Sequence, residues 1–308
     1  MPIEEYVFLS GKGGSGKTTV CAAWAQLSGE SNGGRQPVVV DADVEAANLE
    51  LLSRSRRQEE HVFVGNSQPV IDSSGCTVCG RCLEVCRFEA VTIIENRDGQ
   101  RAIPRIDPIL CEGCGACREA CPTGSVEMVP RRSGSWFRSE SRFGPLFHAA
   151  LLPGGENSGK LVARVRKEAR HLAETQGLDY IISDGPPGIG CPVISSLSGA
   201  NLAILVTEPT LSGIHDLVRV LGVCRHFDVP ATVCINKCDL NEANRRQIEE
   251  YCSSEGIAIA SRIPFDNVVT EALAHSVPVV EYSRGQVSRE IEKLWHSVSG
   301  TLEHDEKE

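Results

Sequence analysis

The sequence contains no long apolar run and no surplus of positive charge. No stretch approaches the roughly 18 consecutive apolar residues that a membrane helix requires, and residues 1–14 lack the basic and apolar regions of a secretory signal. The formal net charge is -10, whereas a nucleic-acid-binding surface needs concentrated lysine and arginine. We therefore expect a cytoplasmic protein that has neither a membrane nor a nucleic acid as its partner.

Aromatic residues are also scarce, at 5% of the chain, but the hydrophobic content of 41% is ample for a buried core. A length of 308 residues allows one large α/β domain or two smaller domains. Cysteine, in contrast, is abundant. In a long chain without a secretory signal, 14 cysteines favour metal binding over a disulfide framework.

Eight of the cysteines form two copies of the spacing C-x2-C-x2-C-x3-C, in residues 76–86 and 111–121. Gly80, Glu84 and Val91 recur at the same displacement, so the repeat extends beyond the sulfur ligands. Thiolates suit both zinc and iron-sulfur clusters, but the close spacing favours two 4Fe-4S clusters, with zinc or an empty site as the alternative. The candidate ligands are Cys76, Cys79, Cys82, Cys86, Cys111, Cys114, Cys117 and Cys121.

Residues 72–130 resemble the bacterial two-cluster ferredoxins through these motifs. In that family the fourth cysteine of each run binds the other cluster. The family's proline after the fourth cysteine is present as Pro122, but Arg87 takes its place in the first copy, where its charge predicts a higher reduction potential. The resemblance implies one cluster on Cys76, Cys79, Cys82 and Cys121, and a second on Cys111, Cys114, Cys117 and Cys86.

A phosphate-binding loop is expected near the N-terminus. The pattern G-x-x-x-x-G-K-T begins at Gly11, directly after the apolar run at 6–9 and before a segment typical of a helix. Glycines let backbone N-H groups converge on phosphates at the positive end of that helix. Lys17 would reach the β and γ phosphates, and Thr18 would hold Mg2+. The predicted nucleotide-binding residues here are Gly11, Lys12, Gly13, Gly14, Ser15, Gly16, Lys17, Thr18 and Thr19.

The second lysine of this loop, Lys12, gives the sequence KGGSGKTT at residues 12–19. With it, the chain resembles the deviant-Walker ATPases of the MinD and ParA type. The resemblance implies an ATP-dependent homodimer in which Lys12 reaches the partner subunit's nucleotide and takes part in catalysis. The alternative is an ordinary solvated loop lysine.

Further motifs of that family follow at the ends of apolar strands. By the resemblance, Asp43 would orient the attacking water, Asp41 would support the magnesium shell, and Asp184 would be the Walker B aspartate. Without the resemblance, Asp41 and Asp43 are equally well explained as helix caps.

The base-binding residues implied by the resemblance lie in the C-terminal half. Asn236 would contact adenine, and Pro264 marks a second loop on the adenine side. Lys237 and Asp239 complete an N-K-x-D pattern that selects guanine in GTPases, so the motif alone leaves ATP and GTP open. The family context favours ATP.

Strands near residues 180, 202, 231 and 257 alternate with amphipathic helices, which predicts a doubly wound, mostly parallel sheet of the MinD-like P-loop NTPase class. We expect the ATPase domain in residues 1–64 and 131–308, and an inserted α+β ferredoxin-like domain in 65–130. Residues 64–75 read as a linker, and the chain after residue 133 reads as irregular up to a helix near 160–176.

The combined hypothesis is a slow ATPase that acts as a dimeric switch, coupling ATP to electron transfer to, or metal-cluster assembly on, an unidentified partner protein. One alternative is an iron-sulfur scaffold or carrier, and another is a positioning ATPase with structural clusters. Cys191, which follows the GPPGIG loop, is a candidate for a metal site shared across the dimer, although it lacks the C-P-x-C pair of cluster carriers.

Overall fold

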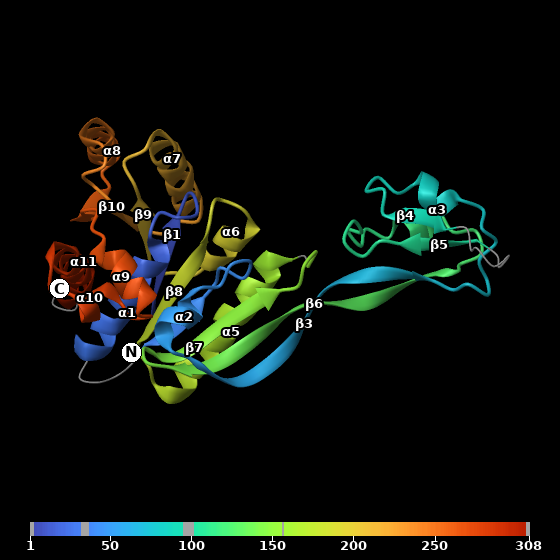
Figure 1. Cartoon of the computed structure of the whole chain (residues 1–308), viewed down its shortest axis with the longest axis horizontal. Helices are drawn as coiled ribbons and strands as arrows, with labels where there is room; N and C mark the ends of the chain where they lie inside the picture. The colour runs from blue at the N-terminus through green and yellow to red at the C-terminus, as the bar shows by residue number, and fades with distance from the viewer. Residues whose placement is uncertain (1–2, 32–36, 95–101, 156, 306–308) are drawn as a thin grey trace. The chain divides into compact units, whose positions relative to one another are not determined.

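The computed structural model of the chain describes residues 3–31, 37–94, 102–155 and 157–305. Strands and helices alternate along most of the chain (Figure 1). The strands are β1 (Glu4–Ser10), β2 (Val38–Asp41), β3 (Arg56–Ile71), β4 (Val91–Ile94), β5 (Ile103–Ile106), β6 (Val126–Ser141), β7 (Gly144–Leu151), β8 (Tyr180–Pro187), β9 (Leu202–Thr207), β10 (Ala231–Asn236) and β11 (Ala258–Ile263). The helices are α1 (Lys17–Ser31), α2 (Leu49–Ser53), α3 (Arg81–Glu84), α4 (Ala116–Glu119), α5 (Ser158–Gln176), α6 (Cys191–Leu197), α7 (Leu211–His226), α8 (Glu242–Ser254), α9 (Val268–Ala274), α10 (Val279–Tyr282) and α11 (Gln286–Asp305).

Most strands belong to one sheet with the order β11-β10-β9-β1-β8-β2-β7-β6-β3. β1 pairs in parallel with β8 and β9, β2 pairs in parallel with β8 and β7, and β10 pairs in parallel with β9 and β11. The doubly wound, mostly parallel sheet is therefore confirmed. Its register places Asp184 opposite both Phe8 and Asp41, so the carboxyl ends of β1, β2 and β8 meet at one edge.

Alternate side chains of β1 enter two hydrophobic cores on opposite faces of the sheet. Tyr6 and Phe8 pack against Trp24 of α1 in a core that also contains residues of α11. Val7 and Leu9 belong to a second core together with residues of α6, α7 and α8. A strand buried on both faces has a continuous apolar sequence, as here. With about 1.5–3 kcal/mol for each large buried side chain, the two cores hold the strand ends firmly.

Two sequence-based expectations about connections are wrong. Most of residues 64–75 belongs to β3 rather than to a linker, and the segment after residue 133 forms β6 and β7 rather than an irregular connection. Glycine, serine and proline in these segments suggested loops. However, β3 ends the strand order of the sheet, and an edge strand tolerates a proline such as Pro69. Pairing with neighbouring strands overrides the local composition.

The chain divides into two compact units. The first comprises Met1–Glu60, Trp136–Ala149 and Gly159–Glu308, and the second comprises His61–Ser135 and Ala150–Ser158. The boundaries expected near residues 65 and 130 fall inside β3 and β6, which contribute residues to both units. No helix in the described part of the chain has both the length and the apolar character needed to cross a membrane.

The second unit repeats one backbone pattern twice. The short helices α3 and α4 each follow a left-handed glycine, Gly80 with φ 79° and Gly115 with φ 78°. A side chain at either position would be strained, which explains why both copies of the motif have glycine there. β4 and β5 form an antiparallel pair, and Cys82, Cys117 and Val126 belong to the small core beside it. The repeat in the sequence is therefore also a repeat in the backbone.

Candidate nucleotide and cysteine sites

The phosphate-binding loop connects β1 to α1 and borders a cavity of about 760 Å3. Gly14 and Gly16 have φ values of 80° and 88°, which other residues rarely adopt. A Cβ atom on Gly16 would lie 2.2 Å from Nδ2 of Asn236, so the close approach of β10 also requires glycine there. The N-terminus of α1 therefore faces a cavity large enough for a nucleotide.

The centre of this site is a buried group of charged side chains. Nζ of Lys17 lies 2.6 Å from Oδ1 of Asp184, whereas Oδ2 of Asp184 is buried without a hydrogen-bond partner in the described structure. Burial and the Asp184 carboxylate raise the pKa of Asp41 to about 7, and burial also raises the pKa of Asp43. An orphaned carboxylate oxygen among crowded acidic groups fits a divalent cation such as Mg2+.

Asp41 also has a structural role. Its Oδ2 accepts hydrogen bonds from the backbone N-H groups of Asn48 at 3.0 Å and Leu49 at 2.9 Å, at the start of α2. Its Oδ1 accepts a bond from the N-H of Asp43 at 3.2 Å. The N-cap residue of α2 is Asn48 rather than Asp41, but the Asp41 carboxylate binds the first N-H groups of this helix and so connects α2 directly to the acidic centre.

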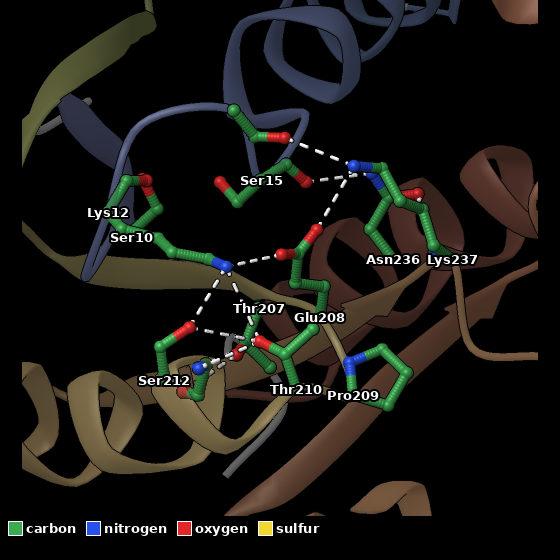
Figure 2. A network of polar contacts seen from close by, with 12 residues as sticks. Ser10, Lys12, Ser15, Thr207, Glu208, Pro209, Thr210, Ser212, Asn236 and Lys237 are labelled. Carbon is green, nitrogen blue, oxygen red and sulfur yellow. Dashed lines mark hydrogen bonds and ion pairs between the residues drawn. The ribbon is translucent and has the colours of Figure 1, made fainter. Parts of the chain in front are cut away.

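Lys12 is held within its own subunit by α7 and the end of β9, as Figure 2 shows. Its Nζ lies 2.5 Å from Oε1 of Glu208 and donates to the hydroxyl oxygens of Thr210 at 3.3 Å and Ser212 at 3.1 Å. The other oxygen of Glu208 pairs with Nζ of Lys237 at 3.0 Å. Burial opposes the charge of Glu208, but hydrogen bonds from both lysines lower its pKa.

The base-side residues contact the phosphate loop from β10. Nδ2 of Asn236 donates to the carbonyl oxygen of Ser15 at 2.8 Å, and Nζ of Lys237 donates to that of Gly14 at 3.2 Å (Figure 2). Asp239, the residue that would read guanine in a GTPase, accepts the backbone N-H of Phe265 at 2.7 Å. It therefore holds the loop after β11 in place.

The eight motif cysteines line two small cavities in the second unit. Within the described ranges, no three His, Cys, Asp or Glu side chains are placed to hold a single metal ion. A 4Fe-4S cluster has its irons at separate corners, so its four thiolates need to surround a space rather than meet at a point. One cavity is lined by Cys76, Cys79, Cys82 and Cys121, and the other by Cys86, Cys111, Cys114 and Cys117.

The protonation of these thiols differs with their surroundings. Burial raises the pKa of Cys82, Cys111 and Cys117. The hydroxyl of Thr123, 3.6 Å from the sulfur of Cys121, lowers the pKa of that thiol, and the N-H of Val78 donates to the sulfur of Cys76. The surroundings of Cys121 therefore favour the thiolate that a metal requires.

The sequence from β1 to α10 matches a profile of the CobQ/CobB/MinD/ParA nucleotide-binding domain over residues 6–279. The chain belongs to this family. It is a MinD/ParA-type ATPase by family, with the fold expected for one. The family's nucleotide-binding function accounts for the cavity beside the phosphate loop.

Two kinds of relative are similar to this chain in sequence. An uncharacterized protein of Methanocaldococcus jannaschii is 31% identical over 297 residues, which cover 96% of each chain. An iron-sulfur cluster carrier protein of Pyrococcus horikoshii is 26% identical over 138 residues, which cover 40% of this chain and 46% of the carrier. The chain thus matches less than half of that carrier's length.

The septum site-determining protein MinD of Pyrococcus horikoshii, solved in complex with Mg-ADP, has a similar fold. It superimposes with a TM-score of 0.57 over 97% of both chains, at 18% sequence identity. At this identity the likeness establishes the fold alone. For this MinD/ParA-type chain, the nucleotide-binding fold is therefore supported by both sequence and structure.

Most of the expected nucleotide residues line the cavity beside the phosphate loop. The cavity is lined by Gly13 to Thr19, Asp43, Asn236 and Pro264. Asp41 and Asp184 lie buried next to Lys17, whereas Gly11 packs against Asp216 and Lys12 is held by Glu208.

Other residues of the site were missed by the sequence analysis. No sequence motif assigns a role to Glu208, which pairs with Lys12. The cavity wall also includes Phe265 and apolar residues of α9 and α11. The amphipathic pattern of those helices indicates burial but not a ligand. Cys191 is exposed at the first residue of α6 and is not among the residues that line the cavity.

Proposed function

We propose that the protein is an ATP-binding and hydrolysing dimeric switch that carries two 4Fe-4S clusters. Its nucleotide state would control electron transfer to, or metal-cluster assembly on, a partner protein. The observation that carries this proposal is the pair of four-cysteine cavities within a MinD/ParA-type chain. Each cavity takes three cysteines from one repeat and the fourth from the other.

The nucleotide half of the proposal assigns a role to each polar group at the end of the sheet. Lys17 would leave Asp184 and bind the β and γ phosphates, while Thr18 and Asp184 would hold Mg2+. Asp43 would orient the attacking water. The engagement of Asp239 with Phe265 supports ATP over GTP, because that carboxylate is already used to hold a loop.

Lys12 would act across the dimer. In the single chain its ammonium group is occupied by Glu208, Thr210 and Ser212, so a second subunit's phosphates would have to replace these partners. Triphosphate offers more negative charge than one carboxylate, and this difference would favour dimerisation in the ATP state. Hydrolysis would remove the γ phosphate and weaken the dimer.

The cysteine half would provide one-electron redox chemistry when clusters are bound. Cys76, Cys79, Cys82 and Cys121 would hold one cluster, and Cys86, Cys111, Cys114 and Cys117 the other. The apolar walls, which include Ile71 and Val126 at the first cavity and Phe88 and Ile106 at the second, would limit the access of water.

Anaerobic reconstitution tests this proposal. We expect about eight iron atoms for each chain and a 4Fe-4S spectrum, with the reduction rate altered by a non-hydrolysable ATP analogue. Cys82→Ser and Cys117→Ser should each lose about half of the iron. Cys191→Ser is the matched control and should keep all of it. A colourless protein would contradict the proposal, and so would a spectrum and a reduction rate that do not change when nucleotide is added.

A cluster carrier is the second candidate, favoured by the partial match to the Pyrococcus horikoshii carrier. A carrier would release its cluster to an apo-acceptor protein in an ATP-dependent way, whereas an electron-transfer switch would retain it. Loss of iron from Cys191→Ser together with loss of dimerisation would support the carrier, because it would indicate a metal shared between subunits.

A further inference from the structure

A set of polar contacts, which includes the buried His148 and Ser139 and the half-exposed Arg57, joins α2 to strands β3, β6 and β7. The proposed nucleotide chemistry uses none of these contacts. The carboxylate of Glu50, on α2, lies 3.2 Å from NH2 of Arg57 on β3 and 3.3 Å from Nδ1 of His148 on β7. Nε2 of His148 lies 2.9 Å from the hydroxyl of Ser139 on β6. One short helix is thus bonded to all three strands, directly or through His148.

The directions of these hydrogen bonds follow from the protonation of His148. This side chain is buried, and burial lowers its pKa to about 4, so the imidazole is neutral near pH 7. The proton of the neutral ring belongs on Nδ1, which faces the Glu50 carboxylate at 3.3 Å, and Nε2 then accepts from the hydroxyl of Ser139. The order Ser-His-Glu occurs in hydrolases, but Ser139 is 1% exposed and no substrate can reach it.

Ring contacts strengthen the connection between the strands. The guanidinium of Arg57 lies over the ring of Phe137, 4.2 Å from its centroid, and Phe137 of β6 stacks on His148 at 5.0 Å. A displacement of Glu50 would therefore act on β3 through Arg57 and on β6 through His148. The Arg57–Phe137 contact combines charge with close packing, whereas the Phe137–His148 contact is a stack of two uncharged rings. Close packing at both contacts resists independent movement.

The residues directly before Glu50, at the N-terminus of α2, belong to the nucleotide site. The Asp41 carboxylate accepts the N-H groups of Asn48 and Leu49 at the start of this helix, and residues 43–46 and 48, which precede it, line the nucleotide cavity. The helix has five residues, of which Leu49 and Leu52 are buried in the main core. Movement of the loop after Asp43 would therefore displace Glu50 with it.

We propose that α2 transmits the nucleotide state from the Asp41–Asp43 loop to strands β3 and β6, with Glu50 as the positioning residue. The inference rests on the proposed nucleotide switch and names the route by which it acts. β3 and β6 continue from the first unit into the cysteine unit, so a change in their hydrogen bonding reaches the segments that flank both motifs. Two nucleotide states that place the loop differently supply the differential contact that such coupling requires.

Amide hydrogen exchange of the full chain, as purified with its clusters, tests the route. Exchange in residues 56–71 and 126–141 is compared with Mg-ADP and with a non-hydrolysable Mg-ATP analogue. In the wild type we expect the two states to differ in both strands. Glu50→Gln should reduce this difference by about threefold or more, while nucleotide affinity changes by less than about twofold.

Glu59→Gln is the matched control, because Glu59 also joins β3 to β6, through Arg138 at 3.0 Å, at a position further along β3 than Arg57. It should leave the nucleotide-dependent difference intact. Arg57→Gln is a second test variant whose side chain is half exposed, so a folded protein is expected even if Glu50→Gln is unstable. It should reduce the difference in β3.

Two outcomes overturn the inference. One is a wild-type protein that binds both nucleotides with identical exchange in these strands. The other is a wild-type difference that persists in both Glu50→Gln and Arg57→Gln. The readout does not need bound iron, so a chain that lacks clusters would contradict the proposed function and leave this test valid.

Discussion

Nζ of Lys17 lies 2.6 Å from Oδ1 of Asp184, although 167 positions separate the two residues in the sequence. Both side chains are buried, and the pair joins the phosphate loop to β8. Burial alone would lower the pKa of Lys17, but the Asp184 carboxylate more than compensates, so the lysine stays charged. A bound Mg-nucleotide would have to separate these partners, since the phosphates need the lysine and Mg2+ needs the aspartate.

Removing one member of this pair should destabilise the nucleotide-free protein. Lys17→Ala leaves the buried charge of Asp184 without a partner, at a cost of about 3–5 kcal/mol in the free energy of unfolding. The double variant Lys17→Met/Asp184→Asn should recover most of that stability while ATP hydrolysis stays absent. Urea unfolding and phosphate release measure the two effects. Equal stability of both variants would contradict the interpretation.

Lys12 should control dimerisation rather than nucleotide entry. Lys12→Ala is expected to slow ATP hydrolysis on the order of 10²-fold and to abolish the ATP-dependent dimer. The reason is that the variant lacks the ammonium group proposed to stabilise the negative charge of the γ phosphate. Light scattering with Mg-ATP and a phosphate-release assay are the measurements.

Glu208→Gln is the informative companion to Lys12→Ala. It keeps Lys12 but removes the carboxylate that holds it, so the dimer should form at a lower ATP concentration. If the Lys12→Ala variant hydrolyses ATP and dimerises like the wild type, Lys12 has no role across subunits.

His148 should make stability fall in mild acid. Its pKa is about 4 in the folded protein against 6.5 when unfolded, so the unfolded chain binds the proton first as the pH decreases. Stability is full above pH 6.5 and decreases between pH 6.5 and 4, by about 3 kcal/mol at most for this shift. His148→Gln should remove this component. The free energy of unfolding of both proteins is measured across that pH range. The same pH dependence in both would argue against a buried neutral imidazole.

Glu5 forms a second buried ion pair, away from the nucleotide cavity. Its carboxylate lies 2.6 Å from Nε of Arg166 and 2.9 Å from NH2 of Arg170, both on α5. Arg166→Leu should cost about 3 kcal/mol in the free energy of unfolding, because the buried Glu5 carboxylate loses one of the two arginines that pair with it. The control is Glu168→Ala, whose exposed pair with Arg164 should contribute less than about 0.5 kcal/mol.

The sequence allowed the sheet and the nucleotide site to be predicted because their patterns are local. The apolar run of β1 and the glycines that follow it specify strand, loop and helix without reference to the rest of the chain. Gly16 illustrates the limit. Its requirement for glycine arises also from Asn236, which is 220 positions away and contacts it only in the folded protein.

The long strands and the contacts of Glu50 could not be predicted in the same way. β3 has 16 residues of mostly exposed, polar character, and its pairing with β6 leaves no alternating apolar pattern in the sequence. Likewise, nothing in the sequence distinguishes Glu208 and Glu50 from glutamates that lie on the protein surface. Their partners, Lys12 and His148, lie 98 or more positions away, so only tertiary structure brings them together.

The separation of Lys17 from Asp184 has a consequence for biosynthesis. The ribosome adds both cysteine motifs after the phosphate loop and before the aspartate that completes the nucleotide site. During translation, the cysteine unit is therefore complete as a polypeptide while the nucleotide cavity still lacks β8. If the proposed clusters are inserted while the chain is being synthesised, their insertion precedes the ability to bind ATP.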